Sequence, residues 1–314
     1  MFGQPKGRKL PQEPKAKNQA LYCIVIAVLM LVALISGRLS MSLEGEVVQS
    51  DAEFQVHVID VGQGDSILIL ADGHAMLLDS GIAASGAVVA RYLDTLGIEE
   101  LDYVAASHLH ADHIGGFVKA LADRKVGAFL EPPCPDNLIP TGTVYEMYLS
   151  TIEQSGAELR EIRAGDSFTL GGAEVAVLAP GEETPDSLNN DSLVFQVKYG
   201  DTVCLFTGDM ESEEEAELLE RETFLKADFL KVAHHGSGGT TGEDFLARTA
   251  PKYAVISCGK DNSYGHPAKS TLERLDKYAG EVYVTTDFGN VVYLYDADTR
   301  QRSIVTSKKP EETT

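Results

Sequence analysis

Ten consecutive residues, Ser107–Gly116 (SHLHADHIGG), constrain this chain more than any other feature. They follow the apolar stretch 101–107, which predicts a buried strand, and they hold three of the chain's eight histidines. Imidazole nitrogen and carboxylate oxygen are ligands that suit zinc, manganese or iron. A polar surface loop is the alternative, and chance rarely gathers so many such groups. We therefore predict a metal site with the ligands His108, His110, Asp112 and His113.

Two further strand ends carry the same residue types. The run LFTGD ends at Asp209, and one carboxylate there can bridge two cations, although a lone aspartate at a strand end is more often a turn former. The run VAHHGS places His234 and His235 at another strand end, where at least one imidazole is available. Five of the eight histidines thus fall at predicted strand ends, where an α/β architecture collects its site.

Short apolar runs separated by Gly and Asp begin at residue 53 and predict the fold. The early part is rich in hairpins, including two strands at 54–59 and 66–70 joined by a tight turn, and later strands alternate with helices such as 114–122 and 211–222. Two mixed sheets, face to face with helices outside, satisfy this order. We predict one α/β hydrolase domain over residues 52–305.

The charge of the chain bears on its partners. The formal net charge is −22, with many of the acids in Glu211–Glu222, which reads as a solvated helix face. Proteins that grip nucleic acid through its phosphates usually present a basic face. The acidic balance argues against a long footprint on DNA, but a substrate held by bound metal ions remains compatible with it.

The N-terminal region predicts a membrane segment. Residues 1–20 form a basic tail, and 21–37 are uncharged and apolar, at the short end for a transmembrane helix. The basic side is expected in the cytoplasm, which makes this a single-pass protein of the cell membrane with an extracytoplasmic catalytic domain. A signal peptide cleaved near Ser40–Ser42, giving a secreted protein, is the alternative. Residues 38–51 read as a linker and 306–314 as a disordered tail.

The cysteines are scattered and show no C-x-x-C spacing, which favours free thiols but leaves a single disulfide open outside the cytoplasm. They are Cys23, Cys134, Cys204 and Cys258.

The motif SHLHADHIGG resembles the H-x-H-x-D-H motif of the metallo-β-lactamase superfamily. Asp79 in LLDSG, Asp209 and the histidine of HHGS are similar to the superfamily's strand-end aspartate, bridging carboxylate and late ligand. More narrowly, VIDVGQGDSILI, the TGD segment, KVAHHGS and Tyr264–Pro267 (YGHP) resemble the hydrolase domain of ComEC-type competence proteins, which act in DNA uptake. The resemblance implies a four-layer αββα sandwich with metals along one edge of the sheets.

It also implies two divalent metal ions, with zinc the first choice and manganese the alternative. One ion takes His108 and His110, and the other takes Asp112, His113 and a histidine from the pair that follows the third strand end. Asp209 bridges them, and the pair at 234–235 is expected to supply its ligand from either His234 or His235. Hydroxide then attacks phosphorus or a carbonyl, Asp112 is a candidate proton acceptor, and His266 is a candidate donor of a proton or hydrogen bond.

Two departures from the family pattern matter. Many superfamily members have a histidine between the first motif and the bridging aspartate, whereas residues 188–192 here read LNNDS, so Asn190 or Asp191 is expected to take that place. ComEC-type proteins also embed this domain in a polytopic channel. With at most one span, this chain is not expected to form a DNA channel itself.

Other polar residues are expected to play supporting roles. Asp60 and Asp65 flank the GQG turn and are expected to hold the metal loops through hydrogen bonds. Lys231 and Lys260 are weak candidates for a phosphate contact. His57 and His74 are expected to be structural.

The leading prediction is a phosphodiesterase or nuclease acting on DNA or nucleotides outside the cytoplasmic membrane. A lactamase- or thioesterase-type hydrolase shares the metal chemistry and is the second prediction. A non-catalytic, metal-binding competence or envelope accessory is the third.

Overall fold

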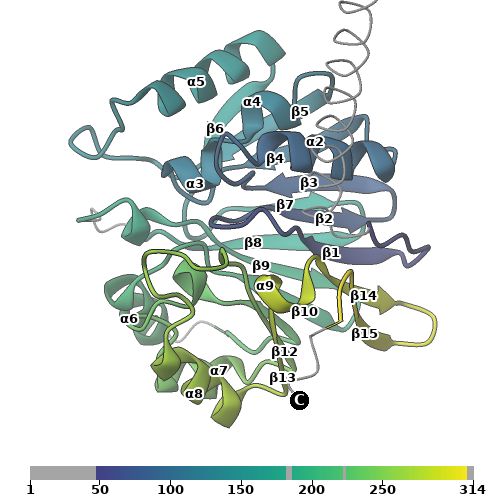
Figure 1. The fold of residues 1–314 in the computed structure, drawn as a ribbon, viewed down its shortest axis with the longest axis vertical. Coiled ribbons are helices and arrows are strands. Elements are labelled where there is room, and N and C mark those ends of the chain that lie inside the picture. Colours follow the sequence, from purple (N-terminus) through teal and green to yellow (C-terminus); the bar gives the residue numbers. More distant parts are fainter. Residues whose placement is uncertain (1–46, 182–185, 222–223, 310–314) are drawn as a thin grey trace, which may run out of the picture. The chain divides into compact units, whose positions relative to one another are not determined.

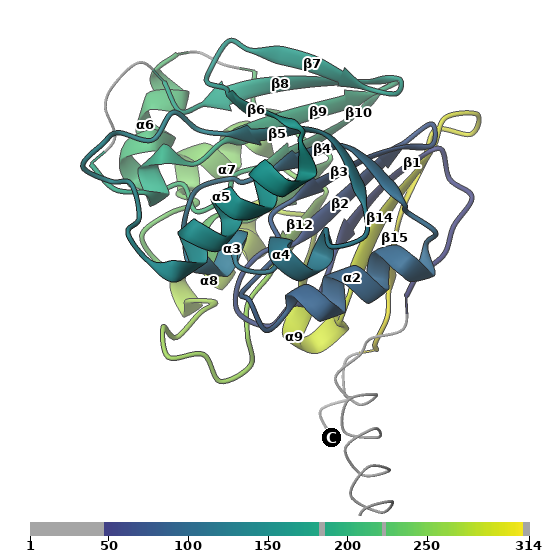
Figure 2. The ribbon, with the colours of Figure 1, turned by 90° about the horizontal axis from the view of Figure 1, so that it is seen from above.

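Two β-sheets stack face to face and carry helices on their outer faces (Figures 1 and 2). The computed structural model describes residues 47–181, 186–221 and 224–309. Within these ranges, no helix combines the length and apolar character that crossing a bilayer requires. The predicted membrane segment at 21–37 lies outside the described residues, as do the basic tail and most of the linker.

The first sheet has eight strands. Its β15-to-β3 part is antiparallel and its β3-to-β6 part is parallel. In spatial order the strands are β15 (Gln301–Thr306), β14 (Val291–Asp296), β1 (Phe54–Val58), β2 (Ile67–Ala71), β3 (His74–Leu78), β4 (Glu100–Ala105), β5 (Lys125–Glu131) and β6 (Glu158–Glu161).

The second sheet has seven strands, parallel from β10 to β13 and antiparallel from β7 to β10. In spatial order they are β13 (Glu281–Val284), β12 (Tyr253–Ile256), β11 (Phe229–Lys231), β10 (Thr202–Phe206), β9 (Val194–Tyr199), β8 (Ala173–Ala179) and β7 (Ser167–Leu170).

Alternation along the strands builds the core between the sheets. In β1, Phe54, Val56 and Val58 all pack in this core, because successive strand residues point to opposite faces. In β2, Ile67 faces the same core, while its neighbour Leu68 packs on the helical side. Both faces of the first sheet are therefore buried at its central strands β1 and β2.

Helices complete the outer layers, and each helix layer shares an apolar core with its sheet. The first sheet is covered by α2 (Gly86–Thr95), α4 (Phe117–Ala120) and α5 (Thr143–Ser155), and the second by α6 (Ser212–Glu220), α7 (Glu243–Thr249) and α8 (Lys269–Tyr278). The short helices α3 (Ala111–Ile114) and α9 (Thr285–Phe288) lie in connections. The predicted two-sheet α/β sandwich with outer helices is confirmed.

The helix expected at 114–122 is wrong, because the segment divides into α3 and α4 at two glycines. A Cβ on Gly116 would lie 2.0 Å from the carbonyl oxygen of Ser80, and one on Gly115 would lie 2.6 Å from the backbone nitrogen of Ala83. Neighbouring backbone therefore passes directly against this joint. Strands β5, β6 and β15 are further elements that the sequence pattern did not predict.

The connection between β1 and β2 is longer than the expected tight turn and passes under the metal loop. Gly64 has φ +122°, and a Cβ there would lie 2.3 Å from the carbonyl oxygen of Asp112. The next residue, Asp65, donates its backbone N–H to the same carbonyl. Glycine at this position lets the first hairpin support the loop that carries Asp112.

The acidic helix is not a purely solvated face. Glu214 and Glu215 of α6 are buried, and Glu215 accepts hydrogen bonds from the backbone N–H of Gly242. Burial raises the pKa of Glu214 well above its usual range. Cys134, Cys204 and Cys258 are free thiols, and Cys23 lies outside the described residues.

Candidate metal centre

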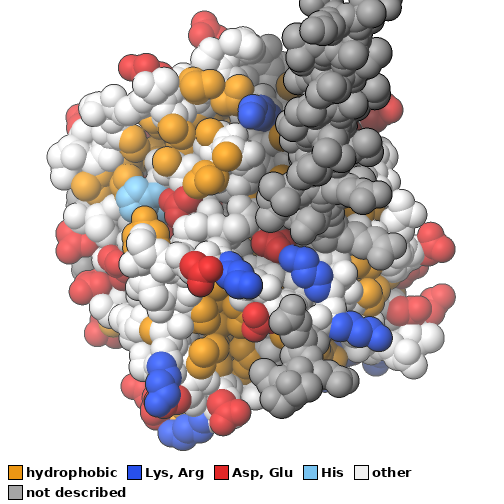
Figure 3. Space-filling view, in the orientation of Figure 1, with side chains coloured by type: hydrophobic (Ala, Val, Ile, Leu, Met, Phe, Trp, Pro, Cys, Tyr) orange, Lys and Arg blue, Asp and Glu red, His pale blue; other side chains and the backbone are white. Residues whose placement is uncertain are grey.

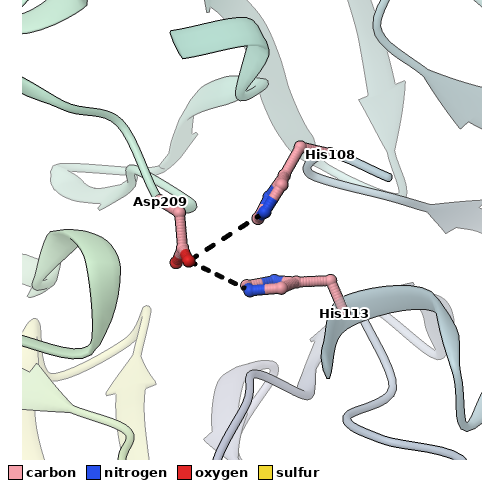
Figure 4. A group of neighbouring side chains, drawn as sticks. All are labelled: His108, His113 and Asp209. Atoms are coloured by element: carbon pink, nitrogen blue, oxygen red, sulfur yellow. Dashed lines mark ion pairs between the residues drawn. The ribbon is translucent and has the colours of Figure 1, made fainter. Parts of the chain in front are cut away.

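Loops from both sheets converge at one edge of the sandwich. The loop after β4 carries His108 and His113, and the turn after β10 carries Asp209. His113 Nε2 lies 3.3 Å from Asp209 Oδ2, and His108 Nε2 lies 3.9 Å from the same oxygen. In Figure 4 both rings point toward the carboxylate from the opposite side of the site. Segments about a hundred residues apart thus bring polar side chains within 4 Å of one another.

The turn after β11 brings in a third imidazole. His235 Nε2 lies 3.4 Å from Asp209 Oδ2 and 3.5 Å from Asp112 Oδ2. Its Nδ1 donates to the carbonyl oxygen of Ser257 at 2.9 Å, which leaves Nε2 free to face the carboxylates. His235 is therefore the member of the His234–His235 pair that reaches between the two aspartates.

His234 takes a different position. It is partly exposed, with Nε2 at 3.7 Å from Asp209 Oδ2 and Nδ1 at 3.6 Å from Glu211 Oε1. Both histidines have left-handed backbone conformations, with φ 47° for His234 and 53° for His235. Such strain in two successive residues with side chains persists only where the surroundings enforce it, and it directs the two rings to different sides of the turn.

Asp79 orients His113 from behind. Its Oδ2 contacts His113 Nδ1 at 2.9 Å, and its two oxygens accept hydrogen bonds from the N–H and hydroxyl of Ser107. A carboxylate on Nδ1 sets the imidazole so that Nε2 faces the site, the arrangement seen behind metal-bound histidines. Asp79 itself has φ 60°, a strained conformation at the end of β3.

His108 and His110 form the other side of the cluster. His108 Nε2 and His110 Nδ1 are 2.9 Å apart and share a hydrogen bond. Burial, together with neighbouring His113, lowers the pKa of His108 well below its usual value, so this imidazole is neutral. A neutral imidazole is the form that ligates a metal ion.

Several potential metal-binding atoms of the cluster have no hydrogen-bond partner among the described residues. His113 Nε2, His235 Nε2 and Asp209 Oδ1 are buried and make no hydrogen bond with any described residue. Buried polar atoms are normally satisfied, so three such atoms around one point suit the binding of a cation. Four overlapping groups have ligand atoms within 4.8 Å of one another, and two of them consist of predicted metal ligands alone, namely His108, His113 and Asp209, and Asp112, His113 and His235. The residues fit a pair of ions.

The pKa shifts of the cluster also favour bound cations. Burial opposes charge on His113 and His235, but Asp209 and the other carboxylates outweigh it and raise the pKa of both imidazoles well above the usual value. Conversely, His235 and His113 overcome the effect of burial on Asp209 and lower its pKa well below the usual value. The carboxylates that favour a proton on His113 and His235 would favour a bound cation for the same reason. Metal binding should therefore release protons from these imidazoles.

Asn189, rather than Asn190 or Asp191, lies at the place expected for a further ligand. It lines the cavity beside His110, and its buried Oδ1 has no hydrogen-bond partner among the described residues. Asn190 instead bonds Asp186, Glu213 and the backbone of Glu211, and Asp191 does not line the cavity. The expectation for Asn190 and Asp191 is wrong, because the 3-10 turn at Asn189–Asp191 directs each residue differently.

Asp65 and Lys231 form a buried ion pair behind the site. Lys231 Nζ lies 2.8 Å from Asp65 Oδ2, and both side chains are essentially fully buried. Asp65 Oδ1 also lies 3.4 Å from His235 Nδ1, so the predicted support of the metal loops holds for Asp65. The suggested phosphate contact is wrong for Lys231, because it has no exposed surface.

The remaining sequence candidates lie away from the cluster. Asp60 contacts Gly62 and Lys308 rather than the metal loops, and Lys260 is exposed but does not line the cavity. His57 and His74 are structural, as predicted. His57 is buried against Tyr92 and Gln55, and His74 contacts Asp102.

The cluster opens into a cavity of about 380 Å³. On the face seen in Figure 3, a histidine reaches the surface beside acidic and apolar side chains, and the Lys and Arg side chains of that face lie elsewhere. His266 lines the cavity, with its ring centroid 5.6 Å from that of His234. The full lining is Gln63, His110, Ala111, Asp112, Asn189, Asp209, His234, His235, Tyr264 and His266.

Four contributors to the site were not predicted from the sequence: Asn189, the Ser257 carbonyl, Tyr264 and the pairing of Asp65 with Lys231. A signal existed for two of them. Ser257 ends an apolar strand, as Asp209 does, and Tyr264 stands beside His266 in the YGHP segment. The pairing of Asp65 with Lys231 had no local signal, because 166 positions separate the two residues (231 minus 65).

The fold and the cluster of histidines and aspartates define a metallohydrolase class, and comparison with known families agrees. The family model described as the metallo-beta-lactamase superfamily matches residues 59–260. The chain belongs to this superfamily.

Similar curated proteins have names associated with competence and recombination. The chain is 34% identical over 266 residues to the "ComE operon protein 3" of Bacillus subtilis, which covers 78% of this chain and 33% of that protein. It is 32% identical to "Recombination protein 2" of Haemophilus influenzae, with 77% and 29% covered. It is 30% identical to "Competence protein ComA" of Neisseria gonorrhoeae, with 71% and 30% covered. The chain thus matches about a third of each relative's length.

Solved structures support the fold alone. The diiron β-hydroxylase CmlA from Streptomyces venezuelae superposes with a TM-score of 0.52 at 13% identity, covering 82% of this chain and 55% of that one. At this identity the likeness concerns the sandwich and carries no information about the substrate.

Proposed function

We propose that the chain is a metal-dependent phosphodiesterase or nuclease that acts on DNA or nucleotides. The observation that carries this proposal is the convergence of three buried atoms without hydrogen-bond partners among the described residues, His113 Nε2, His235 Nε2 and Asp209 Oδ1. Two of these residues, Asp209 and His235, line an open cavity. Relatives named for competence and recombination support a nucleic-acid substrate over an antibiotic.

The residues present suit two divalent ions, zinc first and manganese as the alternative. His108 and His110 would hold one ion, with Asn189 Oδ1 close to that side, and Asp209 would bridge. The other ion would take Asp112, His113 and His235. Such ions, when bound, lower the pKa of water toward neutrality and neutralise charge on a phosphoryl oxygen.

The chain's own groups would then orient the substrate and move protons. Asp112 is the candidate proton acceptor, since its Oδ2 lies beside His235 at the cavity wall. Burial and the neighbouring His234 and His235 lower the pKa of His266, so it is neutral at neutral pH. We therefore assign His266 a hydrogen bond to the substrate rather than donation of a proton.

The names of the relatives, rather than the cavity lining, favour a phosphodiester over a lactam or thioester. Ala111 and the ring of Tyr264 are the apolar parts among the described lining residues, and the rest are polar. Polar and apolar surface are nevertheless present in this lining in comparable amounts. A purely structural metal scaffold would not need donors that open to a cavity.

The proposed location is the cell membrane, with the catalytic domain outside the cytoplasm. It rests on the apolar stretch 21–37 and the basic residues before it. Extraction without detergent tests it, because recovery of a shortened chain in the soluble fraction would support the cleaved signal peptide instead.

Removing a candidate ligand tests the function. We expect His110→Ala or Asp209→Ala to lose bound metal and to lower hydrolysis of bis-p-nitrophenyl phosphate at least a hundredfold. His74→Ala is the matched control, because this histidine is exposed and paired with Asp102 outside the cavity.

The measurements are metal content by mass spectrometry, and kcat/KM with the phosphodiester, with supercoiled plasmid and with nitrocefin. Full activity in either ligand variant would refute the two-ion site. Hydrolysis of nitrocefin alone would favour the lactamase reading, and metal binding with no hydrolysis would favour the scaffold.

A further inference from the structure

An exposed aromatic side chain stands at the mouth of the cavity. Tyr264 lines the cavity and is 68% exposed, whereas most aromatic side chains of the domain are buried. One face of its ring stacks on His266, with centroids 5.7 Å apart and planes inclined by 25°. The high exposure leaves the other face of the ring open to a ligand.

The loop that presents Tyr264 is held in shape by Asn262. Asn262 Oδ1 accepts hydrogen bonds from the backbone N–H groups of Tyr264 and His266, and its Nδ2 donates to the carbonyl oxygens of Gly259 and His266. The N–H of Gly259 donates to Gln63 Oε1, which ties the loop to the first hairpin. An exposed ring on a fixed loop needs little ordering when it binds a ligand.

The rings form a continuous series from the metal cluster outward. The centroid of His235 lies 6.5 Å from that of His266, and Tyr264 follows at 5.7 Å from His266. A group stacked on the open face of Tyr264 would therefore continue the row of rings that begins at the candidate ligand His235. The ring of Tyr264 thus lies at the outer end of the series, on the side from which a substrate enters the cavity.

The described lining of the cavity has no lysine or arginine of the kind that usually holds the phosphates of a nucleic-acid backbone. None of the described lining residues is a lysine or an arginine, Lys231 is buried, and the chain carries a net charge of −22. Bound ions would hold the scissile phosphate, but flanking phosphates find no cation in the lining. Affinity for the rest of the substrate must come from another kind of contact, and an aromatic face is available.

We propose that Tyr264 is a stacking platform for the nucleobase beside the scissile phosphodiester, so that the substrate is a nucleotide or a strand with unpaired bases. Aromatic rings bind bases of any sequence through their faces. Bases inside a duplex already stack on one another and cannot reach the ring without being extruded. The inference rests on the proposed phosphodiesterase function and narrows its substrate class.

The test compares strands with and without bases. Zinc-loaded wild type, Tyr264→Ala and Tyr264→Phe are assayed on oligothymidylate and on an abasic strand of the same length and backbone. We expect Tyr264→Ala to lower kcat/KM about tenfold more on oligothymidylate than on the abasic strand, whereas Tyr264→Phe keeps wild-type values because the ring face remains. Phe224→Ala is the matched control, since Phe224 is 66% exposed but does not line the cavity.

Binding gives a second measurement that does not depend on turnover. Fluorescence anisotropy with a hydrolysis-resistant phosphorothioate oligothymidylate should show about tenfold weaker binding for Tyr264→Ala, and the same sequence paired in a duplex should bind wild type more weakly than the single strand.

Equal effects of Tyr264→Ala on base-bearing and abasic strands, or no effect on either, would overturn the stacking role while leaving the phosphodiesterase in place. Absence of hydrolysis of every phosphodiester by the metal-loaded wild type would overturn the proposed function instead. The anisotropy result then decides the role of Tyr264 separately.

Discussion

Lys231 shows how one buried side chain can support a site that it does not touch. Its ammonium group neutralises Asp65, which in turn lies beside Nδ1 of His235. Lys231 and the other positive neighbours overcome the effect of burial and lower the pKa of Asp65 to about 2. The Asp65 carboxylate is therefore charged although it has almost no contact with water. Its ionised form depends on the positive groups around it.

We expect Lys231→Met to destabilise the fold by about 3 kcal/mol, because it leaves the Asp65 carboxylate buried without its cation. Lys231→Met combined with Asp65→Asn should recover part of this loss, since no charge is then left unpaired. Urea denaturation measures both variants, with the exposed Lys260→Met as the control expected to change stability by less than about 0.5 kcal/mol. A double variant less stable than Lys231→Met would contradict the role of the pair.

Glu131 gives the fold a pH dependence away from the metal cluster. Burial raises its pKa to about 7, opposed by the hydrogen bond that Tyr148 donates to Glu131 Oε2. In the unfolded chain the pKa returns to its ordinary value near 4.5. Folding thus favours the neutral acid, so protonated Glu131 contributes to the free energy of unfolding. This contribution is complete below about pH 4.5 and is lost as the pH rises through 7.

Glu131→Gln keeps an oxygen for Tyr148 and cannot ionise. We expect this variant to be about 2 kcal/mol more stable than wild type near pH 8.5, with the difference disappearing toward pH 4.5. Thermal or urea denaturation across this range, at one fixed metal concentration, measures the effect. A difference that does not change with pH would show that Glu131 is not buried as described.

At the scale of elements, the joint between α3 and α4 couples the metal loop to the first sheet. The backbone N–H of Gly116 donates to the carbonyl of Gly81, and the N–H of Ser80 donates to the carbonyl of His113. These contacts place the residues after β3 directly beneath the H-x-H-x-D-H segment. There is no room between them for a side chain.

We expect Gly116→Ala to destabilise the domain by about 2 kcal/mol and to reduce bound metal, because the new Cβ must displace the backbone at Ser80. Gly239→Ala is the matched control, since a Cβ there meets nothing within 4 Å. Thermal denaturation and metal analysis of both variants measure the effect. Wild-type metal content in Gly116→Ala would show that the loop tolerates movement of this joint.

The elements also show what the sequence could predict and what it could not. Strands with strong alternation, such as Phe54–Val58, and strand ends rich in His and Asp were predictable, because periodicity and ligand chemistry are local properties. The edge strand Glu158–Glu161 was not, since all four of its side chains are exposed and no apolar pattern marks it. The choice of His235 over His234 depends on the Ser257 carbonyl, which comes from another strand.

At the scale of the whole molecule, the acidic balance predicts an unusual response to salt. A protein with six to ten phosphate contacts loses roughly 10³ to 10⁵ in affinity between about 50 and 200 mM salt. With no lysine or arginine among the described cavity residues, we expect binding of phosphorothioate oligothymidylate to weaken less than about tenfold over this range. Anisotropy titrations at several salt concentrations measure the slope, and a steep one would reveal a basic surface elsewhere.

The candidate ligands come from both sheets. His108, His110, Asp112 and His113 follow β4 of the first sheet, whereas Asp209 and His235 follow β10 and β11 of the second. Ions bound by both groups would therefore link the two sheets of the sandwich at this edge. Mutations that weaken metal binding would also weaken the packing of one sheet against the other. A change in catalytic activity caused by such a mutation would therefore come with a change in the stability of the fold.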